Sequence, residues 1–443
     1  MKSKQELTKK LSSVKEPIVI YGAGVAGQVL LLACKEAGIQ IESFCDNNIK
    51  KKGNTLNSLE IIHTDDIKNR HPEAIFLISS ADINDIKNHL VDYGYLETNL
   101  YPGGTILKGF DFSEFKNYYE PYNDEDKDKG FVEFAISSTI ECHDGYLDPK
   151  KVFMRSVDIV VTEKCTMKCV DCSNLMQFFE KPESYELDEM NKAIELLCSF
   201  SDQIFEFRII GGEPFINKKI HNVVEKLILE PKVKRIVIYT NGNIIPRENQ
   251  IECLRHDKVL MNITDYSRSG EKVEDEYTKK LSRFKRTTDK LEQLCIDNKI
   301  DYRRHPPENW TDCGRIENFN RTLEENQRVF DECCCKNLTT LSKNELHRCP
   351  FSAQITRLGV CDEKEDYIDL TKHSDPIANR KEIKSLLDNK RSLKACDFCP
   401  GRALHDPQIV PAIQIKMALP YKRNIKLSDS IIATSEKHLN KIR

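Results

Sequence analysis

The sequence lacks an apolar run long enough to cross a bilayer, and its first residues, MKSKQELTKKLSSVKEP, lack the apolar core of a secretory signal peptide. It also lacks an excess of charge of either sign, because 67 Lys and Arg stand against 70 Asp and Glu, a formal net charge of -3. These features argue against a membrane span and against a global attraction to nucleic acid. They predict a cytoplasmic protein whose partners must be inferred from local sites.

Cysteine, in contrast, is abundant, with 17 residues in 443. In a reducing compartment this abundance argues against a disulfide framework, so clustered thiols indicate metal or redox chemistry. The cysteines outside the clusters lie in patterned segments and are interpreted mostly as small core residues. The clustered ones form two groups: Cys165, Cys169 and Cys172, and then Cys333, Cys334, Cys335, Cys349, Cys396 and Cys399.

The length and the changes in pattern along the chain predict several domains. Residues 113–149 are polar and largely without period, and are interpreted as a linker between two αβ regions. The tail is mildly basic, and both packing as a helix and contact with a partner stay open for it. The expected segments are a Rossmann-like domain at 1–112, the linker, a βα region at 150–330, a cysteine-rich region at 331–405 and the tail at 406–443.

The first αβ region contains a glycine motif. The segment EPIVIYGAGVAGQVLLLACKEAGIQIESFCDNN predicts a strand, a glycine turn, a helix and a second strand. Gly22, Gly24 and Gly27 form G-x-G-x-x-G in that context, and Asp46 follows about twenty residues later. Glycine lets the backbone approach a diphosphate at a helix N-terminus, and the acid can meet a ribose hydroxyl. We expect a nucleotide or dinucleotide there; a domain that binds nothing, or only holds a partner, is the alternative.

Strands and helices alternate again from about residue 150. Strands are expected at SVDIVVT, IFEFRIIGG, VKRIVIYTNG, VLMNITDY and IDYRRH. This repetition predicts an α/β fold with a parallel sheet, open or rolled into a full or partial barrel, and function at the carboxyl ends of its strands. The first cysteine group, GGEP, TNGN and TDYS follow four successive strands, so all four are expected at one mouth.

Three thiols within eight residues are one ligand short of a tetrahedral zinc site. Three thiolates can instead hold three irons of a cubane iron-sulfur cluster and leave the fourth iron open for another ligand. The alternative is a zinc knot completed by a distant His or Cys, which leaves GGEP unexplained.

The Cys165-x3-Cys169-x2-Cys172 spacing after one strand, with Gly211, Gly212, Glu213 and Pro214 after the next, resembles the radical S-adenosylmethionine superfamily. The resemblance implies a partial (β/α)6 TIM-type barrel, a 4Fe-4S cluster and S-adenosylmethionine on its open iron. Reductive cleavage, with an electron from a flavodoxin or ferredoxin, would then give a 5'-deoxyadenosyl radical.

The same resemblance implies roles for further residues. The backbone of Gly211 and Gly212, with Glu213, would help to hold the methionine amine. Asn241 and Asn262, at later strand ends, would contact the ribose, or would cap turns. Many members of the superfamily have an aromatic residue near adenine immediately before the third cysteine, and this chain has an aspartate there, at position 171.

The second cysteine group resembles the twitch form of the SPASM extension, in which four cysteines hold an auxiliary iron-sulfur cluster. The resemblance implies Cys349, Cys396 and Cys399 as ligands, with either Cys334 or Cys335 as the fourth. In the segment LSKNELHRCPFSA we expect a hairpin in which Asn344 takes the left-handed turn position. A zinc-stabilised subdomain is the alternative.

Two other cysteines, Cys313 and Cys361, are each a candidate hydrogen-atom donor or a buried residue. Arg303, Arg304 and His305 end the fifth expected strand and would suit an anionic substrate, or form a solvated face.

Residues 17–112 resemble the Rossmann-like N-terminal domains of nucleotide-sugar acetyltransferases, with IYGAGVAG and CDNN as the matching pieces. Those domains usually carry a histidine where this chain has Ala26. The combined expectation is a radical enzyme that takes hydrogen from a sugar or polyol on a nucleotide diphosphate or a phosphate, giving oxidation, epimerisation or dehydration. A peptide-modifying maturase and a non-catalytic iron-sulfur protein with a Rossmann interaction module are the alternatives.

Overall fold

The computed structural model divides the chain into two compact units, Met1–Arg155 and Ser156–Arg443. Among the helices it describes, none is both long and apolar enough to span a bilayer. The residues described are 3–115, 125–148, 150–268, 276–307, 310–361, 363–373, 375–403, 406–415 and 417–420.

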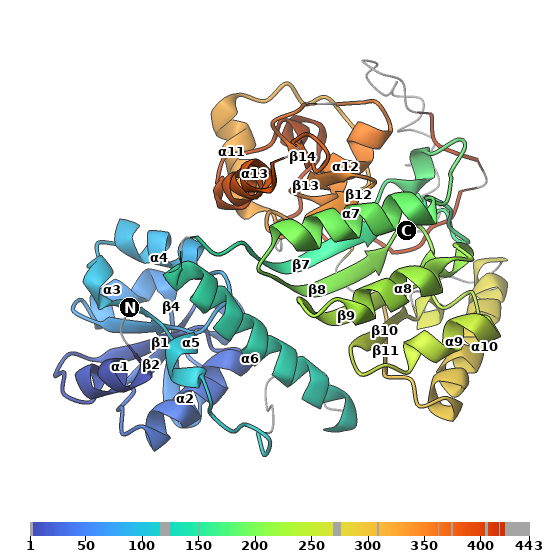
Figure 1. Ribbon diagram of the computed structural model, residues 1–443. Helices are drawn as coiled ribbons and strands as arrows, with labels where there is room; N and C mark the ends of the chain where they lie inside the picture. Colours follow the sequence, from blue (N-terminus) through green and yellow to red (C-terminus); the bar gives the residue numbers. More distant parts are fainter. Residues whose placement is uncertain are drawn as a thin grey trace. The chain divides into compact units, whose positions relative to one another are not determined.

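The first unit is built on a six-stranded sheet in the order β3-β4-β2-β1-β5-β6 (Figure 1). All neighbouring strands are parallel except the hairpin of β3 and β4. Beyond β1 the order of strands reverses, since β2 and β4 lie on one side of it and β5 and β6 on the other. The strands are β1 (Ile18–Tyr21), β2 (Ser43–Asp46), β3 (Thr55–Leu56), β4 (Leu59–His63), β5 (Ile75–Ile78) and β6 (Leu100–Pro102).

Helices complete this unit: α1 (Lys4–Leu11), α2 (Val25–Glu36), α3 (Thr64–Arg70), α4 (Ile83–Asp92), α5 (Gly104–Leu107) and α6 (Glu125–Leu147). Helix α6 falls inside the segment for which the composition predicts a linker, and residues 116–124 of that segment lie outside the described part of the chain. Val132 and Ile136 of α6 are buried in the core that also contains Leu30 and Ile106. The linker prediction therefore differs from the structure, because a few apolar residues at helical spacing suffice to dock a largely polar helix.

His143 fastens α6 to the sheet. Its ring is fully buried; Nδ1 accepts from the backbone N–H of Gly104 at 2.8 Å, and Nε2 donates to the carbonyl of Ser80 at 2.8 Å. Because Nδ1 is an acceptor, the ring is neutral in this arrangement. Burial lowers the pKa of His143 from about 6.5 to about 4.

We expect the first unit to lose stability as the pH falls from about 6.5 to about 4, because the unfolded chain takes up the proton of His143 before the folded one does. The shift corresponds to about 3 kcal/mol of unfolding free energy. Urea unfolding followed by circular dichroism at pH 7.0 and 4.5 measures it, and the difference between wild type and His143→Gln isolates this residue from the carboxylates. An equal pH dependence in the two proteins would contradict the prediction. Fluorescence of Trp310, which belongs to the second unit, is the internal control.

The second unit contains an eight-stranded sheet in the order β11-β10-β9-β8-β7-β12-β13-β14. Neighbours are parallel from β8 through β11 and between β7 and β12, whereas β13 and β14 are antiparallel additions. The strands are β7 (Phe153–Val160), β8 (Gln203–Ile210), β9 (Val233–Thr240), β10 (Val259–Thr264), β11 (Tyr302–His305), β12 (Thr339–Ser342), β13 (Glu345–His347) and β14 (Tyr367–Asp369). The five strands predicted from the βα repetition are all present. The described strands form an open parallel sheet, as a partial barrel requires, and not a closed barrel.

The helices α7 (Leu187–Phe200), α8 (Ile220–Leu229), α9 (Glu248–Leu254) and α10 (Glu276–Asp297) lie along one face of this sheet (Figure 1). That face is apolar, and Phe207 and Ile209 of β8 and Ile236 and Ile238 of β9 are fully buried. Helix α8 buries Ile220, Val223, Val224 and Leu227, the apolar positions that predicted it. The opposite face carries polar residues.

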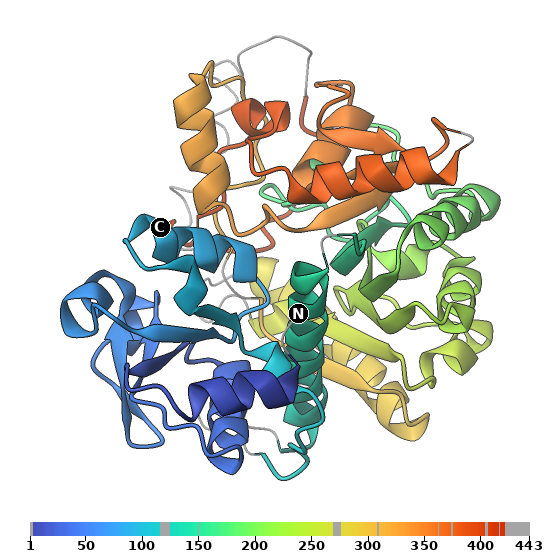
Figure 2. The same cartoon turned by 60° about the vertical axis from the view of Figure 1, so that its left-hand side comes forward.

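The cysteine-rich region continues the same sheet, because β12 pairs with β7 and is followed by β13 and β14. The separate small domain expected there is therefore not confirmed. Helices α11 (Leu323–Glu332), α12 (Pro350–Arg357) and α13 (Pro376–Asp388) gather around these last strands (Figure 2). The predicted hairpin is present between β12 and β13, but Lys343, with φ of 52°, takes the left-handed position expected for Asn344.

Candidate functional site

The first group of cysteines lies in the loop that follows β7. The backbone N–H of Met167 points at the sulfur of Cys165 at 3.4 Å, and Lys168 has a left-handed φ of 52°, which turns the loop before Cys169. Cys165 and Cys172 pack against Cys169 and Met167, which are buried. The loop therefore brings together the three thiols that the spacing predicts.

Burial and mutual charge both act on these thiols. Burial, and then the charges of Cys172 and Cys165, raise the pKa of the Cys169 thiol well above its usual value. Burial also raises the pKa of Cys172 to about 11, with the charge of Cys165 adding to the effect. Three thiolates so placed repel one another, and a bound metal cofactor would remove that cost by supplying positive charge.

The donor set fits a cluster better than one ion. Three thiols are one ligand short of a tetrahedral zinc site, whereas a cubane cluster held by three thiolates keeps one iron open for another ligand. Each thiolate of a cubane cluster binds a different iron atom, so its ligands stand further apart than those of one ion. The backbone N–H directed at the sulfur of Cys165 is of the kind that stabilises cluster thiolates.

The loop after β8 approaches the cysteine loop closely at two glycines. The N–H of Gly212 donates to the carbonyl of Thr162 at 2.9 Å. A Cβ atom on Gly211 would stand 2.2 Å from that carbonyl oxygen, and one on Gly212 would stand 2.2 Å from the carbonyl oxygen of Lys164. Only glycine fits at both positions, because any side chain would push the two loops apart.

Glu213, for which the resemblance implies a role at the methionine amine, is hydrogen-bonded within the protein, and that role stays a prediction. Its side chain is fully buried and accepts from the hydroxyl of Thr240 at 2.9 Å and from the N–H groups of Asn241 and Phe215 at 2.8 and 3.2 Å. Burial raises the pKa of the carboxyl to about 7, although these hydrogen bonds favour the charged form. The carboxylate thus ties the end of β8 to the end of β9, and Pro214 is the buried first residue of the short helix η4 (Pro214–Ile216).

The two predicted ribose contacts come from the neighbouring strands β9 and β10, Asn241 directly after β9 and Asn262 opposite Tyr239, and their role at a ribose stays a prediction. Asn241 lies at the cysteine loop, where its Nδ2 is 3.7 Å from the sulfur of Cys165 and donates to the hydroxyl of Thr166 at 3.0 Å. Asn262 lies within β10, opposite Arg303 of β11, and is largely buried. Asn241 therefore belongs to the cysteine site, and the structure adds no contact between Asn262 and that site.

Two aromatic residues at this site were missed from the sequence. Tyr266 and Trp310 pack against the cysteine loop, with ring centroids 6.1 Å apart in an edge-to-face arrangement. The sequence held a hint of each. Trp310 is the sole tryptophan of the chain, and Tyr266 lies just beyond the carboxyl end of β10, where site residues are expected. They supply aromatic surface beside a loop whose residue before the third cysteine is Asp171.

The tail contributes to the same site in extended form. Gln414 forms an isolated antiparallel bridge with Cys169 of the cysteine loop, and Gln408 forms one with Thr311. The N–H of Val170 donates to the carbonyl of Ile413 at 2.8 Å. We call residues 406–415 the strap. The helical alternative for the tail is therefore wrong over these residues, and residues 421–443 lie outside the described part.

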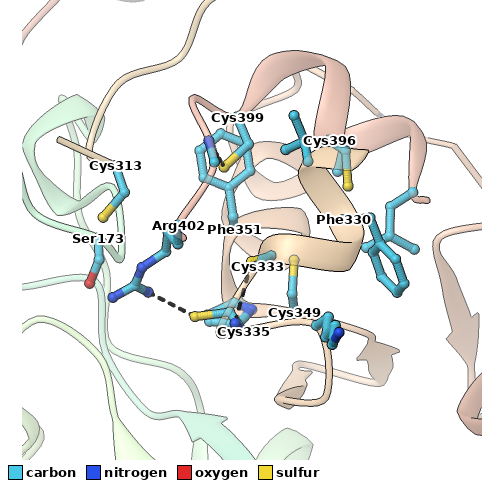
Figure 3. A pocket seen from close by; sticks show the side chains of 16 residues that line it. Ser173, Cys313, Phe330, Cys333, Cys335, Cys349, Phe351, Cys396, Cys399 and Arg402 are labelled. Atoms are coloured by element: carbon cyan, nitrogen blue, oxygen red, sulfur yellow. Dashed lines mark hydrogen bonds between the residues drawn. The ribbon is translucent and has the colours of Figure 1, made fainter. Parts of the chain in front are cut away.

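The second group of cysteines lines a cavity (Figure 3). Its walls come from the loop before Gly314, from α11 and the run after it, from the start of α12 and from the segment around the short helix η6 (Lys394–Phe398). Its cysteines are Cys313, Cys333, Cys335, Cys349, Cys396 and Cys399. The N–H groups of Ser352 and Gly401 point at the sulfurs of Cys349 and Cys399 at 3.3 and 3.4 Å.

The cavity distinguishes between the two candidates for a fourth ligand. Cys335 is buried and lines the cavity, whereas Cys334 is exposed and does not line it. After burial, the charges of Cys396, Cys399 and Cys335 raise the pKa of Cys349 well above its usual value. Cys335, Cys396 and Cys399 are therefore the three thiols whose charges act on Cys349.

Cys313 and Cys361 differ in position. Cys313 lines the cavity on the side of the first cysteine loop, and its charge acts on both Cys172 and Cys399. Cys361 is buried in the neighbouring apolar core and does not line the cavity, and burial raises the pKa of its thiol to about 12. Of the two candidate hydrogen-atom donors, only Cys313 lies between the cysteine groups.

The basic residues at the end of β11, Arg303, Arg304 and His305, interact largely with other residues of the protein. Arg304 donates to Asp265 at 2.7 Å and pairs with Asp289 at 2.8 Å and with Glu292 at 2.6 Å. Three carboxylates therefore neutralise this guanidinium. Arg304 is thus engaged within the protein and not free for the predicted anionic substrate. His305 is half-buried and its Nδ1 lies 2.8 Å from the carbonyl of Pro306.

The glycine motif of the first unit forms the turn from β1 into α2. Gly22 has φ of +103°, and a Cβ atom on Gly27 would stand 1.9 Å from the carbonyl oxygen of Gly22, so this helix start requires glycine. Gly24 is the N-terminal cap of α2, and a Cβ atom there would meet nothing within 4 Å. The turn lies at the carboxyl end of β1, where the strand order reverses, which is the usual ligand position in such sheets.

Asp46, expected to meet a ribose, is held by the protein. Its carboxylate accepts from the N–H of Ala23 at 2.8 Å, from the N–H of Asn48 at 2.9 Å and from Nζ of Lys51 at 3.2 Å. These bonds fix the glycine turn to β2, and a ribose hydroxyl would compete with them.

Two family descriptions match parts of the chain. Residues 159–310 match the Radical SAM superfamily, and residues 14–100 match C2185-like, N-terminal. The first match supports a radical S-adenosylmethionine domain in an enzyme, in agreement with the resemblance carried by the two motifs, and leaves the reaction open. The resemblance of the N-terminal segment to the domains of nucleotide-sugar acetyltransferases stays a prediction.

Curated relatives match over short stretches. The GTP 3',8-cyclase of Stenotrophomonas maltophilia is 25% identical over 88 residues, 20% of this chain and 26% of its own length. The molybdenum cofactor biosynthesis protein moc-5 of Caenorhabditis elegans is 32% identical over 101 residues, 22% of this chain and 16% of its own. The chain thus spans about a quarter or less of the length of these two relatives.

Similar solved structures include BtrN in complex with AdoMet and 2-DOIA, at 14% identity, 58% of this chain, 98% of that chain and a TM-score of 0.34. Another is SuiB of Streptococcus suis bound to the precursor peptide SuiA, at 16% identity, 64% of this chain, 77% of that chain and a TM-score of 0.33.

Proposed function

We propose that this enzyme, in which residues 159–310 match the Radical SAM superfamily, uses Cys165, Cys169 and Cys172 to hold a 4Fe-4S cluster that activates S-adenosylmethionine. A cluster held by these three thiols would supply one-electron chemistry for the reductive cleavage of S-adenosylmethionine and, through it, for removal of a hydrogen atom from the substrate. The observation that carries the proposal is the convergence of three thiols on one loop against Gly211 and Gly212 of the next strand end.

The residues around this site hold its loops in position and shield the cysteine loop from solvent. Gly211 and Gly212 allow the loop after β8 to approach the cysteine loop, and buried Glu213 keeps the backbone of Asn241 in place. Tyr266 and Trp310 cover the loop with aromatic surface, and the strap closes it from another side. Such enclosure keeps water out of the site. A reactive radical requires that exclusion.

The second cysteine cavity supports an auxiliary iron-sulfur cluster, as in a twitch or SPASM region. We assign its ligands to Cys335, Cys349, Cys396 and Cys399, which line one cavity and of which the other three act electrostatically on Cys349. Cys313 stands between this cavity and the first cysteine loop, where it is a candidate to exchange a hydrogen atom with the substrate.

A polar substrate is supported by the sheet face opposite the helices. Arg208 of β8 donates from Nε to Asp158 of β7 at 2.6 Å and lies over the ring of Tyr239 of β9, 5.8 Å from its centroid. Tyr239 is 37% exposed on this face, and Glu206 pairs with Arg235 at 3.5 Å. Mixed charges and hydroxyl groups suit a hydroxylated molecule better than an apolar one.

We infer a sugar or polyol on a nucleotide diphosphate or phosphate as the substrate class. The inference rests on the glycine turn of the first unit, where a helix N-terminus and an open Gly24 can receive a diphosphate. Oxidation, epimerisation and dehydration would each follow from removal of one hydrogen atom.

The proposal is tested anaerobically. The protein is reconstituted with iron and sulfide, the iron per chain is counted, and 5'-deoxyadenosine is measured after addition of S-adenosylmethionine with dithionite, or with a flavodoxin or ferredoxin. We expect the nucleoside to form, and to form faster with one of a panel of nucleotide diphosphate sugars. Absence of cleavage by a fully loaded protein would reject the proposed activity in favour of a non-catalytic iron-sulfur protein. Acceleration by a peptide alone would favour a maturase.

Gly24→Val is expected to weaken binding of a nucleotide diphosphate sugar at least about tenfold, the cost of one lost contact of about 1.4 kcal/mol. The new side chain meets nothing in the protein but would occupy the space before the helix N-terminus. Calorimetric titration measures the binding, and formation of 5'-deoxyadenosine should not change. Gly27→Ala, in which the Cβ atom would collide with Gly22, is the contrasting variant and should lower the thermal midpoint. If Gly24→Val binds the nucleotide diphosphate sugar as tightly as the wild type does, the glycine turn is not the site that binds it.

A further inference from the structure

The second cysteine cavity contains one cation directed at a sulfur. Nη1 of Arg402 donates to the sulfur of Cys335 at 3.1 Å (Figure 3). Ser173 and Cys313 lie on the other side of the guanidinium. Arg402 therefore stands between the cavity and the loop that carries the first cysteine group.

The backbone of Arg402 is fixed to the same run of cysteines. Its carbonyl accepts from the N–H of Cys334 at 2.9 Å, and the next residue, Ala403, forms an isolated bridge with Cys333. Two contacts, one from the backbone and one from the side chain, thus hold the run with Cys333 and Cys335 at the cavity and direct the guanidinium at Cys335. Cys335 receives the guanidinium, and Cys334 is left exposed.

A charged donor at a ligand sulfur has two effects on a cluster. It holds the ligand in place, and it lowers the energy of the reduced state, because reduction adds negative charge next to the cation. Hydrogen bonds to the sulfurs and net charge are among the factors that set the potentials of iron-sulfur clusters.

We propose that Arg402 is a positioning residue of the second cysteine site: it selects Cys335 as the fourth ligand and raises the reduction potential of the cluster held there. This inference rests on the auxiliary cluster of the proposed function. A neighbouring arginine offers a comparison, since Nη1 of Arg321 donates to the carbonyls of Cys396 and Cys399 at 2.7 and 2.9 Å and not to a sulfur.

The test uses the full chain with Cys165, Cys169 and Cys172 replaced by alanine, so that only the second site can hold a cluster. Arg402→Gln, Arg402→Lys and the control Arg321→Gln are each added to this parent. Iron is counted, and the midpoint potential is measured by redox titration monitored by electron paramagnetic resonance. We expect a more negative midpoint in Arg402→Gln, an intermediate value in Arg402→Lys and a smaller shift in Arg321→Gln, because Arg321 acts on Cys396 through its charge and donates to carbonyls.

Loss of iron from Arg402→Gln, with iron retained in Arg402→Lys, also supports the proposal, because a cation then suffices to hold the ligand. An unchanged midpoint in Arg402→Gln, an equal shift in Arg321→Gln, or loss of iron from both Arg402 variants would overturn it. A parent that binds no iron would instead overturn the proposed auxiliary cluster, and with it this inference, so the two failures are distinguishable.

Discussion

Replacing Cys165, Cys169 and Cys172 together with alanine is expected to abolish formation of 5'-deoxyadenosine and to lower the bound iron by about four atoms per chain. The three thiols share one loop, and their charges act on one another. The second cysteine cavity is built from other segments of the chain and should keep its iron. Iron analysis and quantification of the nucleoside by chromatography measure both effects.

The matched control is Cys198→Ala, since Cys198 is buried in α7 and lies in neither cysteine group. It should leave both quantities unchanged. Loss of all iron from the triple variant would show that the two sites do not form independently, and residual nucleoside formation would exclude this loop as the site of cleavage.

Cys335→Ser is expected to remove the auxiliary iron, about four atoms per chain, whereas Cys334→Ser should retain it. The structure gives the reason, because Cys335 lines the cavity under the guanidinium of Arg402 and Cys334 is exposed outside it. The measurement is the iron content of each variant after reconstitution, in the background that lacks the first cysteine group.

Cys333→Ser is the informative third variant, since Cys333 also lines the cavity and its sulfur accepts from the N–H of Cys335 at 3.3 Å. We expect it to keep most of the iron. If Cys333→Ser loses the iron and Cys335→Ser keeps it, the fourth ligand is Cys333 and its assignment to Cys335 is wrong.

The elements that carry the first site were predictable from sequence because local signals and burial agree there. Most strands of the βα series are rich in β-branched and aromatic residues, and each predicted segment became a strand of the sheet. The cysteine spacing and GGEP occupy successive strand ends, which a parallel sheet brings to one edge. Gly211 and Gly212 show why the motif needs glycine, since the two loops nearly touch.

The predictions that differ from the structure depend on contacts distant in sequence. Arg304 ends a strand as an apparent anion ligand, but α10 supplies Asp289 and Glu292 to neutralise it. Helix α6 has few apolar residues, and only the core of the first unit shows which of them are buried. Each of these pairings arises from tertiary structure, which local pattern does not encode.

The strap carries a consequence for how the first site is assembled. Its residues pair with the loop around Cys169 and Val170, yet a ribosome makes that loop long before it makes Ile413 and Gln414. Contacts between such distant segments form late in folding, because a long loop must close before they can be made. During synthesis the three thiols are therefore uncovered on the side that the strap later closes. Iron and sulfide would reach the loop most easily in that interval, so a cell short of iron would complete a closed but empty enzyme.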